Sequence, residues 1–242
     1  MTKISDFIKP WVEKLKVNLK DSQMELLDAL SETMLSDPLY KSVSKIFEPE
    51  EIAIKHFLDS LIPLCYNLPL WKSKNILDLG TGGGFPCLPL AIALPESNFT
   101  AVDGRQKSVD FVSRMAKNIG LKNVNTIHSR IEDLGQDKNH REKYDLVLCR
   151  ALSSVRVLAE YTLPLTIDKG WSLYYKGPKL DEELTEASNA FKILGVEPEN
   201  IEIFRLLPPE IPFERNFISI HKTKSVSAKY PRKAGTPLSK PL

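Results

Sequence analysis

Cysteine, histidine and long hydrophobic runs are scarce in this sequence. Its 242 residues contain three cysteines and four histidines. Cys65, Cys87 and Cys149 are odd in number and far apart, so they predict neither a disulfide framework nor a zinc cluster. The histidines are equally scattered along the chain. We therefore expect no metal site.

No stretch approaches the roughly 20 consecutive apolar residues that a membrane span requires. The first residues, MTKISDFIKPW, lack the apolar centre of a signal peptide. Hydrophobic residues make up 42% of the chain and charged residues 26%, which is typical of a globular protein that buries a full core. We therefore expect a cytoplasmic protein that does not contact a membrane, built as one α/β domain or as a domain with a modest extension.

Acidic residues are absent from the C-terminal end. Residues 222–242 contain six basic side chains and no acidic one. The whole chain has 33 basic and 31 acidic residues, so the part before Lys222 is net negative and the excess positive charge lies in the tail. The tail lacks hydrophobic periodicity and is rich in Pro, Ser and Lys. It is expected to be a flexible basic arm, and such arms commonly bind nucleic acid.

Glycine, in contrast, is concentrated in one stretch, NILDLGTGGGFPCLPLAIAL, from Asn75 to Leu94. An apolar run predicts a short buried strand at 76–79. Four glycines within the next five positions permit a sharp turn and a close approach of a ligand to the main chain. Pro86 suits the first turn of a helix, and apolar residues follow at helical spacing. The stretch therefore predicts a strand, a glycine turn and a helix, the first half of a βαβ nucleotide-binding unit.

The spacing of the glycines indicates which ligand the turn holds. It does not fit the Gly-x-Gly-x-x-Gly/Ala fingerprint of dinucleotides, and no Gly-Lys-Ser/Thr follows as in a P-loop. The pattern Asp78-x-Gly80-x-Gly82-x-Gly84 instead resembles the first motif of class I S-adenosylmethionine-dependent methyltransferases. Asp103 stands about 20 residues further on, where a βαβ nucleotide fold places its ribose ligand. A glycine-rich turn without a ligand remains the alternative.

The remaining periodicity predicts an α/β fold. Residues 1–72 are expected to be helical, with helices around 8–19 and 24–34 and a third beginning near Glu48. Further strands are expected at 99–102, 124–128, 144–148, 171–175, 201–207 and 216–221, with helices at 105–119, around 155–159 and at 180–194. Prolines rather than a helix separate the last two strands, so these strands should pair antiparallel.

This layout predicts the Rossmann-like sheet of a class I methyltransferase with an antiparallel C-terminal hairpin, preceded by a helical region. We divide the chain into a helical N-terminal extension packed on the core (1–72), a methyltransferase domain (73–221) and a basic flexible tail (222–242).

The strand at 144–148 is followed by Cys149-Arg150-Ala151-Leu152. This is not the Asp/Asn-Pro-Pro-Tyr/Phe turn with which one large class of enzymes methylates exocyclic amines. Nor does Cys149 follow a proline, as the nucleophile of cytosine C5 methylation does, and it is interpreted as a buried strand residue. Guanine N7 needs neither device, because its lone pair carries no proton.

Several segments together are similar to a known family: LDLGTGGGFPCLPLAIALP, VDGRQKSVDFV, HSRIEDL, CRALSSV, YYKG and KYPRKAGTP. They resemble the small-subunit ribosomal RNA guanine-N7 methyltransferases, also known as the glucose-inhibited division protein B family, from about His56 to the C-terminus. We expect a monomer without a metal ion, and the resemblance implies S-adenosylmethionine as its cofactor. It also implies a substrate of 16S rRNA or the 30S particle, methylated at one loop guanine near the decoding centre.

Carried over to this chain, the resemblance places cofactor contacts on Gly80, Phe85, Ile131-Glu132 and Arg150. Asp78, Gly82, Gly84 and Asp103 join them through the glycine motif. Arg150 is also the candidate for orienting the reactants, with a surface ion pair as its alternative. His56, Asp59 and Ser60 match the family without an assigned role. Cys87 departs from the pattern, which usually has glycine there.

Two other functions remain open. The protein could be a methyltransferase for another substrate, a small molecule or a protein, or a non-catalytic nucleotide-binding module. The basic tail argues against a small-molecule enzyme, which has no need of it, and cofactor turnover would exclude the binding module.

Overall fold

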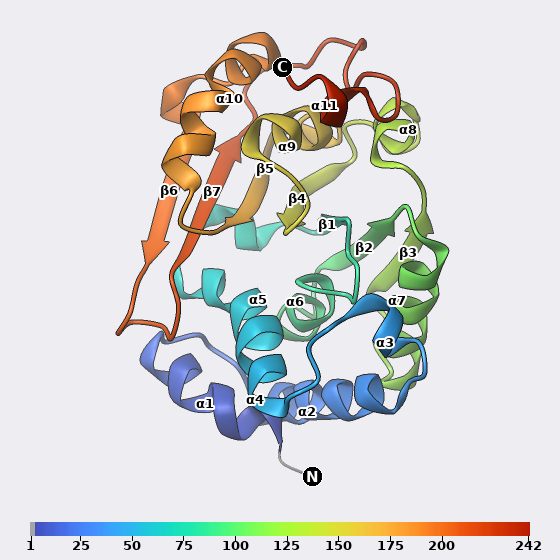
Figure 1. Cartoon of the computed structure of the whole chain (residues 1–242), viewed down its shortest axis with the longest axis vertical. Helices are drawn as coiled ribbons and strands as arrows, with labels where there is room; N and C mark the ends of the chain where they lie inside the picture. Colours follow the sequence, from blue (N-terminus) through green and yellow to red (C-terminus); the bar gives the residue numbers. More distant parts are fainter. Residues whose placement is uncertain (1–2) are drawn as a thin grey trace. The chain divides into compact units, whose positions relative to one another are not determined.

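The computed structural model describes residues 3–242, coloured along the chain in Figure 1. Two compact units make up the chain. The first contains the residues up to Lys74 together with Thr81–His128, and the second contains Asn75–Gly80 and Ser129–Leu242. The chain passes from the second unit to the first within the glycine turn, between Gly80 and Thr81.

The first unit begins with helices, as the periodicity of residues 1–72 predicts. They are α1 (Ile4–Lys14), α2 (Asp21–Ser36), α3 (Tyr40–Val43) and α4 (Pro49–Ile52), which continues through a π-helical stretch (Ala53–Leu58) into α5 (Asp59–Leu61), followed by 3₁₀ turns at Ile62–Cys65 and Pro69–Lys72. Ile4, Ile8 and Val12 of α1 are buried at helical spacing. The main-chain N–H and the hydroxyl of Ser5 both donate to Asp28, which joins α1 to α2.

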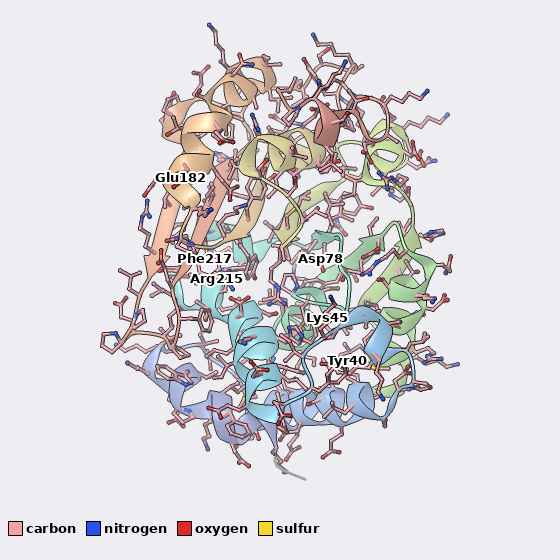
Figure 2. The ribbon with its side chains drawn as sticks, in the orientation of Figure 1. Tyr40, Lys45, Asp78, Glu182, Arg215 and Phe217 are labelled. Carbon is pink, nitrogen blue, oxygen red and sulfur yellow. The ribbon has the colours of Figure 1, made fainter. Side chains whose placement is uncertain are left out.

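The same unit holds two parallel strands, β2 (Asn98–Asp103) and β3 (Val124–His128), with helices α6 (Cys87–Ala93) and α7 (Gln106–Asn118). The N-terminal helices pack on this α/β part: α2 and α5 contact α6, and α2 and α3 contact α7. Tyr40 of α3, labelled in Figure 2, has its ring centroid 6.0 Å from that of Phe111. The N-terminal helices and α6–β3 therefore share one core.

The second unit contains the other five strands, β1 (Asn75–Leu79), β4 (Tyr144–Arg150), β5 (Thr166–Lys176), β6 (Ile201–Leu206) and β7 (Arg215–His221), in the order β1-β4-β5-β7-β6. The pairs β1–β4 and β4–β5 are parallel, whereas β7 runs antiparallel to both β5 and β6. The predicted antiparallel hairpin is therefore confirmed, and its two strands lie side by side in orange in Figure 1.

Helices α8 (Ile131–Gln136), α9 (Val155–Thr162) and α10 (Leu180–Leu194) complete the second unit, with a 3₁₀ turn at Pro198–Asn200 and α11 (Thr236–Ser239) near the C-terminus. Helices α9 and α10 pack against each other. Gly195, with φ +76°, ends α10 in the left-handed conformation that glycine adopts easily. Within residues 3–242, no helix is both long enough and apolar enough to cross a membrane.

The C-terminal segment differs from the expected flexible basic arm. The ammonium group of Lys222 is buried, donates to the carbonyl of Thr166 at 2.7 Å and pairs with Glu142 at 2.7 Å. Burial lowers the pKa of Lys222 from its ordinary value. Arg232 forms an ion pair with Glu160. Lys222 and Arg232 of the tail are thus engaged by acidic residues that lie far away in the sequence. The basic residues of the tail are therefore only partly available to a partner.

Candidate functional site

The glycine turn takes the shape that its spacing predicts. Gly80, Gly82 and Gly84 have φ values of +69°, +56° and +88°, whereas Gly83 has no positive φ. The three left-handed glycines are those of the predicted pattern, at every second position. A side chain would be strained at each of them, and a Cβ on Gly84 would also lie 2.5 Å from Cδ1 of Leu88. The turn therefore needs glycine at these three places and not at Gly83.

Asp103 holds the turn in the first unit. One carboxylate oxygen of Asp103 accepts the main-chain N–H of Gly82 at 2.9 Å, and the other accepts that of Arg105 at 2.9 Å. The main chain of Thr81 is joined to β2 by a 2.9 Å bond to the carbonyl of Val102. The structure thus brings together Gly82 and Asp103, two of the residues predicted to contact the cofactor. Because each carboxylate oxygen has two lone pairs, Asp103 can still accept hydrogen bonds from the hydroxyl groups of a ligand.

Phe85 directly follows the turn, and two residues of the π-helical stretch pack on it. The ring of His56 stacks on Phe85 at a centroid distance of 4.5 Å and an interplanar angle of 16°. Phe57 meets the same ring edge-on at 5.3 Å. Ser44 lies 3.1 Å from Nε2 of His56, and the hydroxyl of Ser60 donates to the main-chain carbonyl of His56. His56 therefore packs on Phe85, a contact that the sequence motif did not reveal.

Asp59 and Ser60 are both buried, on the short helix that follows His56. Single π-helical turns inside α-helices often mark functional positions. Here the wider turn belongs to the element that supports the ring next to the glycine turn. One sequence signal could have revealed this support of Phe85. It is the cluster of three polar residues, His56, Asp59 and Ser60, on an otherwise apolar helix.

In the second unit, Asp78 and Gly80 lie at the carboxyl end of β1. Asp78, labelled in Figure 2, is 1% exposed and is paired in register with Leu148 of β4. A Cβ on Gly80 would lie 2.7 Å from Cδ1 of Leu152, so the segment after β4 closely approaches the start of the turn. Ala151, with φ +51°, has the left-handed backbone that non-glycine residues rarely adopt. Such strain clusters at ligand sites.

Cys149 is fully buried in β4, as interpreted from the sequence. Burial and the neighbouring charge of Asp78 raise the pKa of its thiol well above the ordinary value. A buried thiol with a raised pKa is a poor nucleophile, because the thiolate is the reactive form. Methyl transfer through a covalent bond to Cys149 is therefore disfavoured.

Arg150 ends β4, half-buried and opposite Tyr175 of β5. The loop that follows it is fixed by an ion pair between Lys176 and Glu183. The ammonium group of Lys176 donates to the carbonyl of Ser153 at 2.9 Å and contacts Glu183 at 2.6 Å. The same carboxylate oxygen of Glu183 accepts the N–H of Val155 at 2.9 Å. The sequence did not predict that Lys176 and Glu183 hold this loop. Glu183 lies within the acidic exposed run of α10, where one more carboxylate gives no signal.

Ile131 and Glu132 form the first turn of α8 and are both buried. One carboxylate oxygen of Glu132 accepts the hydroxyl of Tyr161 at 3.2 Å and the main-chain N–H of Gly235 at 2.8 Å. Burial and the nearby negative charge of Glu132 raise the pKa of Tyr161. The side chain of Glu132 is therefore engaged with protein donors, and its contact with a cofactor stays a prediction.

The residues of the turn fit an adenosine-type cofactor. No Cβ occupies the space beside three of its positions, and Asp103 retains lone pairs for hydroxyl groups. The hydroxyl of Thr81 is buried and has no hydrogen-bond partner within the described part of the chain, so the turn contains an unsatisfied polar group. Among residues 3–242, no group of three or more His, Cys, Asp or Glu side chains could hold a metal ion.

Solved structures place the fold in a known class. A proposed O-methyltransferase from Klebsiella pneumoniae matches with a TM-score of 0.54 at 11% identity, covering 89% of this chain and 96% of that one. At this identity the likeness shows the fold alone. Fold and glycine turn together define a class I S-adenosylmethionine-dependent methyltransferase, so the predicted fold class is confirmed.

Sequence comparison gives the particular family. Residues 39–209 match the family model described as rRNA small subunit methyltransferase G. The chain is 39% identical over 242 residues to Ribosomal RNA small subunit methyltransferase G of Desulforamulus reducens, with all of both chains covered. It is 41% identical over 202 residues to the protein of the same name from Lactobacillus johnsonii, covering 83% of this chain and 84% of that one. The chain belongs to the rRNA small subunit methyltransferase G family, and it is an S-adenosylmethionine-dependent enzyme.

Proposed function

We propose that this enzyme transfers the methyl group of S-adenosylmethionine to N7 of one guanine in a loop of 16S rRNA near the decoding centre. Family membership supports a ribosomal RNA of the small subunit as the substrate, because the relatives carry that name. The observation that carries the choice of atom is Cys149. This thiol is fully buried with a raised pKa, at the strand end where another class of acceptor would need a nucleophile.

Guanine N7 suits a site of this kind. Its lone pair is free and carries no proton, so no base has to remove one before methyl transfer. The segment after β4, Arg150-Ala151-Leu152, contains no carboxylate or histidine for such a role. The enzyme must hold the purine in line with the methyl group and keep water away. Positioning alone can lower such a barrier by about 7–11 kcal/mol in the best cases.

When bound, S-adenosylmethionine supplies an electrophilic methyl group on a sulfonium. We assign its binding to the main chain at Gly80, Gly82 and Gly84. Asp103 is assigned to accept hydrogen bonds from the hydroxyl groups of the ribose. Phe85, held by the stacked ring of His56, supplies an apolar wall beside the turn. The main chain at Ile131-Glu132 completes the set of cofactor contacts carried over from the family. Arg150 is assigned to hold the cofactor or to orient the guanine.

We propose that the enzyme acts on a loop of the RNA. Bases in a loop can be splayed out and stacked on flat side chains, whereas paired bases cannot. Exposed lysines of the tail, Lys229, Lys233 and Lys240, are assigned to phosphate contacts. We further propose that the enzyme works as a monomer, because a single chain carries every residue of the assigned set. We also propose that it works in the cytoplasm.

The nature of the methylated nucleoside tests this proposal. Purified enzyme is incubated with methyl-labelled cofactor and, separately, with naked 16S rRNA, 30S subunits and an assembly intermediate. Complete digestion of the RNA should yield label in 7-methylguanosine alone, and the relative yields identify the form of the substrate. Label in an adenine or a cytosine product, or in a ribosomal protein, would contradict the choice of acceptor.

A further inference from the structure

The C-terminal segment Val226–Gly235, called the clasp here, is held by side chains of the second unit that lie far away in the sequence. Arg141 donates to the carbonyls of Val226 at 2.8 Å, Ser227 at 3.3 Å and Tyr230 at 2.6 Å. Gln136, at the end of α8, donates to the carbonyls of Ala228 at 3.2 Å and Pro231 at 2.7 Å. Side chains therefore satisfy the backbone of a segment that has no regular structure of its own.

An ion pair between Arg232 and Glu160 also holds the clasp. Glu160 of α9 is completely buried. Its carboxylate accepts from Nε of Arg232 at 2.8 Å and from Nη2 at 2.6 Å, and it also accepts the main-chain N–H of Arg232 at 2.8 Å. The hydrogen bonds that Arg232 donates to Glu160 raise the pKa of Arg232. A buried carboxylate is costly without its partner, so Glu160 favours the docked clasp.

The clasp ends on the element that follows β3. The main-chain N–H of Gly235 donates to Glu132 in the first turn of α8 at 2.8 Å. Pro231 packs against Gly135 so closely that a Cβ there would lie 2.6 Å from Cγ of the proline. Helix α8 has only six residues, and so short a helix depends on its contacts for its position. Contacts with the clasp occur in both its first and its last turn.

The first turn of α8 begins three residues after β3, and ligands of open α/β folds bind outside the carboxyl ends of the parallel strands. We propose that the clasp positions α8 for cofactor binding, with Arg232, Glu160 and the N–H of Gly235 acting as positioning groups. The proposal depends on cofactor binding and not on which RNA atom is methylated. It gives the tail two faces, an inner face that orders the cofactor site and an outer face that carries exposed Lys229 and Lys233.

Replacement of the central ion pair tests the clasp in the full-length chain. Arg232→Met alone leaves Glu160 buried without its partner, which can unfold the protein. The double variant Glu160→Met/Arg232→Met removes both charges, and such apolar replacements of buried pairs are often tolerated. Its Kd for S-adenosylhomocysteine, measured by calorimetry, should rise about ten- to a hundredfold. The KM for S-adenosylmethionine should rise correspondingly, with a smaller change in kcat at saturating cofactor.

Lys224→Met is the matched control, because it removes an exposed charge of the tail whose partner is Glu197 and leaves the pair of Arg232 and Glu160 intact. Its cofactor affinity should stay within about twofold of the wild type. A folded double variant with unchanged affinity for S-adenosylhomocysteine would overturn the proposal, and so would an equal decrease in affinity in Lys224→Met.

Hydrogen exchange on the wild-type protein decides the question even if the double variant does not fold. Coupling between two sites is reciprocal, so a ligand that prefers the docked clasp must also stabilise it. S-adenosylhomocysteine should slow exchange of the main-chain amides of Arg232 and Gly235, both of which donate to buried carboxylates. Unchanged exchange at both amides under saturating ligand would contradict the clasp.

Discussion

At the scale of single residues, the backbone requires glycine at some positions of the glycine turn and not at others. Four glycines stand within Gly80–Gly84, but only three have positive φ. The fourth, Gly83, would place a Cβ at 3.7 Å from Phe85 and 3.8 Å from Val43, ordinary contact distances. The same stretch of sequence thus offers substitutions that should destroy the turn and one that should not.

Gly82→Val should abolish binding of S-adenosylhomocysteine, because a β-branched residue does not tolerate φ +56° and its side chain would fill the space beside the turn. Gly84→Ala should weaken binding and destabilise the protein by at least about 1–2 kcal/mol, the cost of a left-handed backbone. Gly83→Ala is the control and should bind as the wild type does. Calorimetry and thermal unfolding measure both effects; equal binding by Gly82→Val and Gly83→Ala would contradict this interpretation.

Arg150→Ala should lower kcat/KM about a hundredfold, the decrease typical of a misplaced reactant, while the Tm changes by no more than about 3 °C. Arg150→Lys should recover only part of the activity, since an ammonium group lacks the planar fork of a guanidinium group. Steady-state kinetics with saturating RNA, together with thermal unfolding, give both quantities. If Arg150→Ala loses stability and activity in proportion, Arg150 is a structural residue.

At the scale of elements, the helix through α4, the π-helical stretch and α5 supports the residue beside the turn. His56→Ala should weaken cofactor binding about two- to tenfold, because removal of an aromatic pair costs about 0.5–1.5 kcal/mol. His56→Phe should keep the affinity, as it keeps the stacked ring. His140→Ala removes another stacked histidine, which lies against Tyr144 in the second unit, and serves as the control. Equal cofactor affinity in all three variants would show that the stack does not orient Phe85.

The tail is the element for which the structure changes the expectation most. From the sequence alone, its removal should weaken RNA binding and leave cofactor affinity unchanged. The contacts of Val226–Gly235 with α8 and α9 instead couple the segment to the cofactor site, so truncation would mix two effects. A test of RNA binding therefore has to change only the exposed lysines.

The triple variant Lys229→Gln/Lys233→Gln/Lys240→Gln should weaken RNA binding and leave the Kd for S-adenosylhomocysteine unchanged. The salt dependence of RNA affinity should become shallower by about 0.7–0.9 in log–log slope for each phosphate that the variant no longer neutralises. Filter binding at a series of salt concentrations measures this slope. Equal slopes for variant and wild type would show that these lysines do not contact phosphates.

At the scale of the whole molecule, the sequence predicted most of the fold because local signals and tertiary structure agree. The strand Val124–His128 and the helix Leu180–Leu194 have the predicted bounds, and the other strands differ at their ends only, β5 most of all. The short helices α8 and α11 were not predicted, and α3 was not predicted as a separate helix within residues 1–72. Helices of four to six residues lack a full period of apolar positions, and here tertiary contacts determine them.

The candidate site was predictable in part, for a similar reason. The spacing of the glycines and the place of Asp103 at the end of β2 follow from the geometry of a βαβ unit. The stack of His56 on Phe85 and the pairing of Arg232 with Glu160 join residues separated by 29 and 72 positions. No local pattern encodes such pairs. The division into residues 1–72, 73–221 and 222–242 stays an interpretation, while the N-terminal helices share a core with α6–β3.

The central claim is that the enzyme methylates N7 of one guanine, and strand cleavage tests it most directly. N7-methylguanine is a cation whose weakened ring can be cleaved by mild reduction followed by aniline. Small-subunit RNA that has reacted with enzyme and S-adenosylmethionine should show one new strand break, at a loop guanine. Omission of the enzyme or the cofactor should abolish it. Methylated RNA without a break, or with breaks at many guanines, would contradict the account.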